Sequence, residues 1–451
     1  MRADRQPGAT PPAARAPSVR VATAVRPHSP IEQRALAAVD DAGMLTCLEG
    51  LLRIPSISGS AAENRAQIWF EEQMRACGLS TDLWEIPLAE TSSHPDFPGS
   101  EVARGSALGL VGAWGGDAKG PTLVLNGHID VVPPGDVTQW TDHDPWSAAT
   151  RGGAVYGRGA CDMKGGLVAS LFAIAAVRAA GIATNGRVLL ESVVAEEDGG
   201  LGTFATILRG YRGDAAIIAE PTDLAIVPAC AGALTFRLTV KGRATHASVR
   251  QEGVSTIEKF WIVWSALLDL ERRRNAKPDA LFSRFDLPFP LNVGTLRAGE
   301  WASSVPDQLV AEGRIGVALG EPVADARADL EAAVAAACAQ DRWLREHPPT
   351  VEWFGGQFAS GHIASDHPLV ELVSGAHASL SGFLPDVHGA PYGSDLRLMV
   401  GVAQVPTLHY GPGNVRNAHA PDEHVPIEHM RAVVRTLTLS IVRFCGTNAE
   451  R

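Results

Sequence analysis

Cysteine and long hydrophobic runs are both scarce in this chain. Six cysteines are spread over 451 residues, and none of them forms a C-x-x-C pair. So few thiols argue against a framework of disulfide bonds and favour a reducing compartment, so we expect a cytoplasmic protein. The apolar run from Leu167 to Val177 is too short to cross a bilayer and ends at Arg178. It therefore predicts a core helix, and we expect no membrane as a partner.

Positive charge is also in short supply. The formal net charge is −11, and no block of Lys or Arg follows the first segment of the chain. Because binding to phosphates needs a concentrated basic surface, we expect no nucleic acid as a partner. An apolar fraction of 45% is typical of a soluble globular protein, and the length suits two or three domains.

Residues 1–30 differ from the rest in composition, since they are rich in Pro, Ala and Arg. They lack the apolar core of a secretory signal. Their Arg content loosely resembles that of a transit peptide, but Ser is scarce and Pro is frequent. A segment with so few large apolar residues does not bury enough surface to offset the entropy of ordering. We therefore predict a disordered tail over residues 1–30.

Helical and strand signals alternate over residues 31–232. Helical periodicity covers Ile31–Arg53 and Glu63–Ala76, and short apolar strands then alternate with helices. This alternation predicts an α/β catalytic domain with a mostly parallel sheet and helices on its faces. The expected strands are Thr122–Asn126, Arg187–Ala195 and Ala215–Ala219, and the expected helices between them are Met163–Ala180 and Leu201–Leu208.

The pattern changes over residues 233–352. Leu234–Lys241 alternates in the manner of a half-exposed strand, and two long helical stretches lie among further strands of antiparallel type. This predicts an inserted α+β domain. The α/β pattern returns over residues 353–451, so we expect a catalytic domain in two segments. In the insertion we expect strands at Leu291–Arg297 and Gln308–Val317 and helices at Val254–Arg273 and Pro322–Cys338.

Acids and histidines follow several of the predicted strands. His128 and Asp130 stand two positions apart at a strand end and so face the same way. One of them can bind a metal while the other orients it. Asp162 follows a glycine-rich turn at the start of an apolar helix.

Two further strands end in acids. Glu196, Glu197 and Asp198 follow one of them, and Glu220 follows the next. In α/β sheets, ligand sites lie at such strand ends. If these acids form a catalytic site, one of the three that follow the first strand binds a metal and another transfers a proton. His419 adds an imidazole from the last quarter of the chain.

Each motif alone has an ordinary structural explanation, such as a surface strand end, a helix cap or a solvated turn. Cys161, beside Asp162, fits a small buried residue better than a ligand of soft metal. Together, two histidines and at least three carboxylates suffice for two metal ions that share a bridging carboxylate and activate a water. Imidazole and carboxylate ligands suit Zn²⁺, Mn²⁺ or Co²⁺.

The five motifs, in this order over residues 31–445, resemble those of the zinc metallopeptidases that include acetylornithine deacetylase, succinyl-diaminopimelate desuccinylase, aminoacylase and carboxypeptidase G. The resemblance implies a cofactor of two zinc ions per chain, for which cobalt or manganese can substitute. It assigns His128 and Glu220 to one ion and Glu197 and His419 to the other, with Asp162 bridging them.

The resemblance also assigns roles around the metals. Asp130 is the acid behind His128, and Glu196 is the general base. The peptide bond after Asp162 is expected to be cis. The inserted domain is expected to be a lid and dimerisation domain, in which His246 reaches the active site of a partner subunit. We therefore expect a homodimer.

Other matched positions are expected to contact the substrate, namely Asn292, Arg314, Gly393 and Ser394. Because arginine holds carboxylates bidentately, Arg314 suits a substrate carboxylate, although an ion pair between strands explains it equally well.

Four functions are compatible with these motifs. The first is removal of an acyl group from a small N-acyl amino acid or related amine. The second is deformylation of a formylaminopyrimidine in thiamin salvage. The stretch from Pro391 to Pro426 is close to a subgroup that contains such deformylases. A dipeptidase or carboxypeptidase is the third. A catalytically dead binding module is disfavoured, because every expected ligand and base position is filled.

Overall fold

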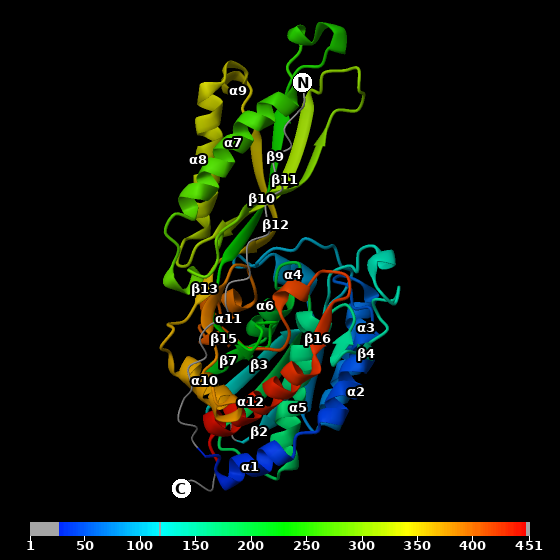
Figure 1. Ribbon diagram of the computed structural model, residues 1–451, viewed down its shortest axis with the longest axis vertical. Coiled ribbons are helices and arrows are strands. Elements are labelled where there is room, and N and C mark those ends of the chain that lie inside the picture. The colour runs from blue at the N-terminus through cyan, green and yellow to red at the C-terminus, as the bar shows by residue number, and fades with distance from the viewer. Residues whose placement is uncertain (1–26, 117–118, 448–451) are drawn as a thin grey trace, which may run out of the picture.

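The computed structural model describes residues 27–116 and 119–447, which form two units stacked along the long axis (Figure 1). Most of the predicted tail lies outside the described residues. Its last two residues belong to the body of the protein, because Ser29 caps helix α1 (Pro30–Ala37) and Pro30 is the first residue of that helix.

A nine-stranded sheet forms the centre of the larger unit. Strands β6, β3, β7 and β15 run parallel at its centre, and antiparallel strands flank them. This confirms the predicted α/β class. The strands are β1 (Ser80–Glu85), β2 (Leu108–Gly115), β3 (Thr122–His128), β6 (Arg187–Val193), β7 (Ala215–Ile218), β8 (Ile226–Cys230), β13 (Gly361–His362), β14 (Val387–Ala390) and β15 (Thr407–His409).

Helices cover both faces of this sheet (Figure 1). Strand β3 is buried along its whole length, since its apolar residues pack against helices on either side. One face carries α1, α2 (Asp41–Leu52), α3 (Ala61–Ala76), α5 (Gly165–Ala179), α10 (Pro368–Ser381) and α12 (Ile427–Cys445). The other carries α6 (Leu201–Leu208) and α11 (Leu396–Gly401), and the short α4 (Leu88–Ser92) follows β1.

The helix that contains the longest apolar run lies inside the molecule. Among the described residues, Ala160–Ala179 is the one helical span long and apolar enough to cross a membrane, and 83% of its apolar window is buried. The segment that precedes α5, Ala160–Lys164, is kinked, because the backbone dihedral angles of Asp162 and Met163 are not helical. All six cysteines are free.

The helix predicted over Ile31–Arg53 is two helices, α1 and α2. The break has a local cause, because Asp40 caps the second helix by accepting a hydrogen bond from the N–H of Gly43. An N-cap residue is not itself helical, so the chain changes direction there.

The smaller unit is an antiparallel sheet in the order β10-β11-β9-β12, with α7 and α8 packed on it (Figure 1). Strand β9 alternates between buried and half-buried residues, which is the pattern its sequence predicts. We call residues 232–358 the inserted unit, and its last strand runs past residue 352, where we expected it to end. It comprises β9 (Gly232–Lys241), α7 (Thr256–Arg274), β10 (Leu291–Ala298), β11 (Gln308–Val317), α8 (Val323–Gln340), α9 (Arg342–Glu346) and β12 (Thr350–Phe358).

Candidate active site

The predicted metal ligands gather at one edge of the large sheet. His128 ends β3, Glu197 follows β6, and Glu220 follows β7. Because these strands are parallel neighbours, their carboxyl ends meet at the same edge. Asp162 comes from the start of the buried helix, and His419 comes from the loop before β16 (His424–Pro426).

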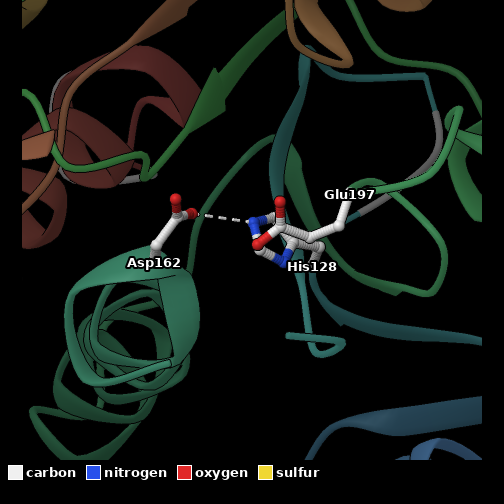
Figure 2. A group of neighbouring side chains, drawn as sticks. All are labelled: His128, Asp162 and Glu197. Carbon is white, nitrogen blue, oxygen red and sulfur yellow. Dashed lines mark hydrogen bonds and ion pairs between the residues drawn. The ribbon is translucent and has the colours of Figure 1, made fainter. Parts of the chain in front are cut away.

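Asp162 lies between the two imidazoles. Its Oδ1 atom is 3.0 Å from Nε2 of His128, and its Oδ2 atom is 3.5 Å from Nε2 of His419. Nε2 of His419 also lies 3.1 Å from Glu197, and Nε2 of His128 lies 4.0 Å from Glu220. Figure 2 shows His128 beside both Asp162 and Glu197.

The donor atoms fit divalent cations. Two groups each offer three donors within 4.8 Å of one another, His128 with Asp162 and Glu197, and His128 with Glu196 and Glu220. Nδ1 of His128 lies 3.0 Å from the backbone carbonyl of Asp130, to which it can donate its proton. With the proton on Nδ1, the lone pair of Nε2, which faces Asp162, is available to a cation. The same distances place Glu196 as close to His128 as a ligand would be, so distance alone does not separate base from ligand.

The charges of the cluster favour bound cations. Burial raises the pKa of Glu196 and of Glu220 well above the usual range of a carboxyl group. Hydrogen bonds from the two histidines hold the pKa of Asp162 below its usual value, although burial opposes them. Hydrogen bonds to Asp162 and Glu197 raise the pKa of His419 to about 10. Two buried and two half-buried carboxylates against two imidazoles leave negative charge that divalent cations would neutralise.

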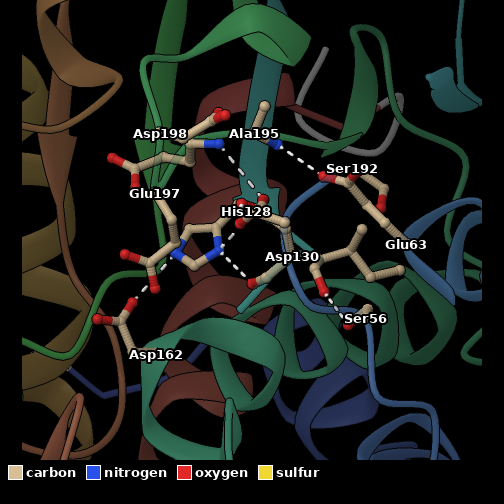
Figure 3. A network of polar contacts seen from close by, with 12 residues as sticks. Ser56, Glu63, His128, Asp130, Asp162, Ser192, Ala195, Glu197 and Asp198 are labelled. Atoms are coloured by element: carbon tan, nitrogen blue, oxygen red, sulfur yellow. Dashed lines mark hydrogen bonds and ion pairs between the residues drawn. The ribbon is translucent and has the colours of Figure 1, made fainter. Parts of the chain in front are cut away.

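Asp130 contacts two neighbours, His128 and Glu196. Its backbone carbonyl, rather than its carboxylate, is the atom within hydrogen-bond distance of His128, since the carboxylate lies 3.8 Å away. The carboxylate accepts hydrogen bonds from the N–H of Glu196 at 3.3 Å and from the hydroxyl of Ser58 at 2.7 Å. Asp130 therefore joins the strand end that carries His128 to the loop that carries Glu196 (Figure 3).

A buried ion-pair network supports the acidic loop, and the sequence motifs do not indicate it. Arg104 bonds Glu63 at 3.2 Å and Asp198 at 2.9 Å, and all three side chains are at most 4% exposed. Glu63 also accepts a hydrogen bond from the N–H of Ala195, which has a φ of +59°. The network thus holds the backbone just before Glu196 in a conformation that alanine seldom adopts.

His246 is not brought to this cluster within one chain. It caps the short helix η3 (Ala247–Glu252), and its Nδ1 atom bonds the hydroxyl of Ser248 at 2.7 Å. The segment between β9 and α7, which carries it, lies at the tip of the inserted unit, far from the large sheet (Figure 1). The side chain of His246 is exposed.

The predicted substrate contacts fall into two places. Asn292 and Arg314 are exposed and pair across β10 and β11 of the inserted unit. Gly393 packs closely against Phe358, and Ser394 is buried with its hydroxyl 2.8 Å from Nε2 of His409. The Ser394 hydroxyl is thus engaged inside the protein.

The residues beside Asp162 also match expectation. The Cys161 thiol is buried and donates to the carbonyl of Asn414 at 3.3 Å, as a small core residue would. The Asp162–Met163 peptide bond is cis.

Imidazoles and carboxylates clustered at the carboxyl edge of a parallel sheet are typical of metal-dependent hydrolases. Within that class, the chain belongs to peptidase family M20/M25/M40, whose family model matches residues 124–443. The protein is thus a metal-dependent hydrolase of amide bonds.

Two bacterial relatives cover most of the chain. The N-formyl-4-amino-5-aminomethyl-2-methylpyrimidine deformylase of Bacillus subtilis is 27% identical over 410 residues, which are 85% of this chain and 90% of the relative. The enzyme of the same name from Halalkalibacterium halodurans is 27% identical over 426 residues, 89% of this chain and 94% of the relative.

Solved structures share the fold. The di-peptidase Dug1p of Saccharomyces cerevisiae superposes with a TM-score of 0.73 at 14% identity, over 92% of this chain and 99% of that one. Human carnosine dipeptidase 1 superposes with a TM-score of 0.72 at 14% identity, over 93% and 100% of the two chains. At such identities the likeness establishes the fold alone.

Proposed function

We propose that the protein uses two divalent metal ions to remove a small acyl group from the nitrogen of an amine. The observation that carries the proposal is the position of Asp162, whose two oxygens face His128 and His419 separately. His128 and Glu220 would hold one ion, Glu197 and His419 would hold the other, and Asp162 would contribute to both. Zinc suits this donor set, and cobalt or manganese substitutes for it.

Glu196 is the general base of the reaction. Bound cations would polarise the amide carbonyl and lower the pKa of a bound water toward about 7. Glu196 accepts the proton of the water whose oxygen joins the carbonyl carbon. It then donates that proton to the amine nitrogen as the carbon–nitrogen bond breaks, which yields a carboxylic acid and a free amine. The N–H of Glu196 is held by Asp130, which fixes the start of its loop.

The inserted unit is a lid, and it also carries the interface through which two chains form a homodimer. Its helix α7 exposes Ile257 and Trp261, which are 54% and 68% exposed in the single chain. Large exposed apolar side chains on one helix suit a surface that a second copy covers. His246 lies at the tip of the same unit, so the residue that stabilises the oxyanion is His246 of the partner subunit.

Two substrate classes compete, and one residue separates them. An N-acyl amino acid carries a carboxylate, which Arg314 of the inserted unit would bind. The deformylases to which the chain is similar are named for a neutral pyrimidine substrate, and this similarity favours the second class. A dipeptide would also present a carboxylate.

The test is a hydrolysis screen of the metal-loaded protein and of its Arg314→Met variant. The panel contains acyl amino acids, acetylornithine, succinyl-diaminopimelate, dipeptides and formylaminopyrimidine. If the substrate carries a carboxylate, the variant should lose about 10- to 100-fold in kcat/KM, because a hydrogen bond to a charged group contributes about 1.5–3 kcal/mol. For a neutral pyrimidine, the variant should match the parent. Hydrolysis of none of these amides would contradict the proposal.

A further inference from the structure

We infer that Glu423 is a positioning residue that holds the proposed bridging carboxylate of Asp162 in position beside His419. The inference deepens the proposed function and rests on it. Glu423 touches none of the reacting groups, and no sequence motif above assigns it a role. Glu423 is 1% exposed, and its carboxylate lies against the loop that delivers Asp162.

The first observation is how Glu423 binds that loop. Its Oε1 atom accepts three backbone hydrogen bonds, from the N–H groups of Gly159, Cys161 and Asp162, each at 3.0 Å. Three N–H groups that converge on one oxygen form an anion-binding concavity. The orientation of the backbone at Asp162 therefore depends on a carboxylate 261 residues further along the chain.

The second observation is the buried partner of the other oxygen. Oε2 of Glu423 accepts a hydrogen bond at 2.5 Å from Arg158, whose side chain is 2% exposed. Arg158 stands in the same glycine-rich loop. A buried charge pair costs little only while both partners are present, so removing the charge of Glu423 leaves Arg158 uncompensated.

The third observation is the backbone around Glu423. Its carbonyl accepts a hydrogen bond from the N–H of Gly157 at 2.9 Å. The next residue pairs with Tyr156, because β16 runs antiparallel to β5 (Ala154–Tyr156). Glu423 follows His419 closely in sequence, so one short segment supplies a proposed metal ligand and holds the loop of the bridging ligand. The distance between Asp162 and His419 is therefore set through Glu423.

A buried Glu–Arg pair elsewhere in the fold provides a matched control. Glu32 of α1 is 3% exposed and accepts hydrogen bonds from Arg443 at 2.7 Å and from the N–H of Ser29 at 2.6 Å. It shares the burial, the arginine partner and the backbone donor of Glu423. It joins α1 to α12, away from the metal ligands. If Glu423 only stabilised the fold, Glu423→Gln and Glu32→Gln would behave alike.

The experiment compares cobalt binding by the full-length parent, Glu423→Gln and Glu32→Gln. Calorimetric titration gives the affinity and number of ions, and the visible spectrum of bound Co²⁺ reports the coordination geometry. Glu423→Gln should bind cobalt about 10- to 100-fold more weakly and with an altered spectrum, which is the usual effect of losing a partner that orients a ligand. Glu32→Gln should lose thermal stability and keep the affinity and spectrum of the parent.

The experiment distinguishes failure of the proposed function from failure of the role assigned to Glu423. If the parent itself binds fewer than two ions, the proposed function is wrong. If the parent binds two ions and Glu423→Gln binds them equally well with the same spectrum, Glu423 is not a positioning residue. Should Glu423→Gln fail to fold, Glu423→Asp keeps the charge for Arg158 but is too short to meet all three N–H groups. That variant should also bind cobalt more weakly, and unchanged binding would overturn the inference.

Discussion

The imidazole of His419 lies 3.1 Å from the carboxylate of Glu197, although 222 residues separate them in the chain. Glu197 follows a strand of the large sheet. His419 stands in a loop, and its own φ is +59°. The pair shows that the second segment of the large unit completes a site that the first segment begins.

Glu196 and Glu197 are adjacent, and variants should separate their roles. Replacement of Glu196 by Ala should lower kcat by a factor of at least about 100, because a general base contributes 10²–10⁴ to the rate. Metal content after dialysis should stay near that of the parent, whereas Glu197→Ala should lose metal. Elemental analysis of both variants measures this. Loss of metal from the Glu196 variant alone would show that the two assignments are reversed.

Asp162 and His128 should differ in how much metal they hold. Asp162→Ala should lose both ions and all activity, since a bridging ligand serves two ions. His128→Ala should chiefly weaken one ion, because a terminal ligand serves a single ion. Competition with a metal-binding dye measures the two affinities separately. An Asp162 variant that retains both ions after dialysis would rule out bridging.

Deletion of residues 1–26 should leave activity and melting temperature unchanged, because their composition offers little apolar surface to bury. Deletion of residues 1–29 should cost about 1 kcal/mol more, because it removes the capping box between Ser29 and Glu32. Thermal unfolding of the two truncated proteins gives the difference. A drop of several degrees on removing residues 1–26 would mean that this segment packs on the body.

Complementation tests the proposed role of His246 across a dimer. Glu196→Ala and His246→Ala should each be nearly inactive alone, since one lacks the base and the other the oxyanion donor. After subunit exchange, a mixed dimer has one site with both defects and one with neither. With random exchange about half the dimers are mixed, so about a quarter of all sites should work.

The control for this experiment is direct measurement of exchange with differently tagged subunits. If exchange occurs and no activity returns, His246 acts within its own chain or not at all. Full activity of His246→Ala by itself would remove the oxyanion role.

Much of the fold follows from local patterns. Helix α6 and strand β11 begin and end where their sequences predict. The signals that determine them, apolar periodicity and flanking turn residues, lie within one short stretch of sequence. Strand ends that carry acids or histidines likewise point to the edge of a parallel sheet. The identity of the proposed ligands His128, Asp162 and Glu197 is therefore present in the sequence motifs.

Only the tertiary structure decided which atoms meet. The sequence motif places the acid Asp130 beside His128, but it does not indicate that the carbonyl of Asp130 is the nearer atom or that its carboxylate accepts a hydrogen bond from the N–H of Glu196. The local sequence around Glu423 likewise does not predict its hydrogen bonds to the Asp162 loop. Periodicity encodes which face of an element is buried, within about one turn or strand. Contacts between residues hundreds of positions apart depend on sheet order and loop path, which no local window contains.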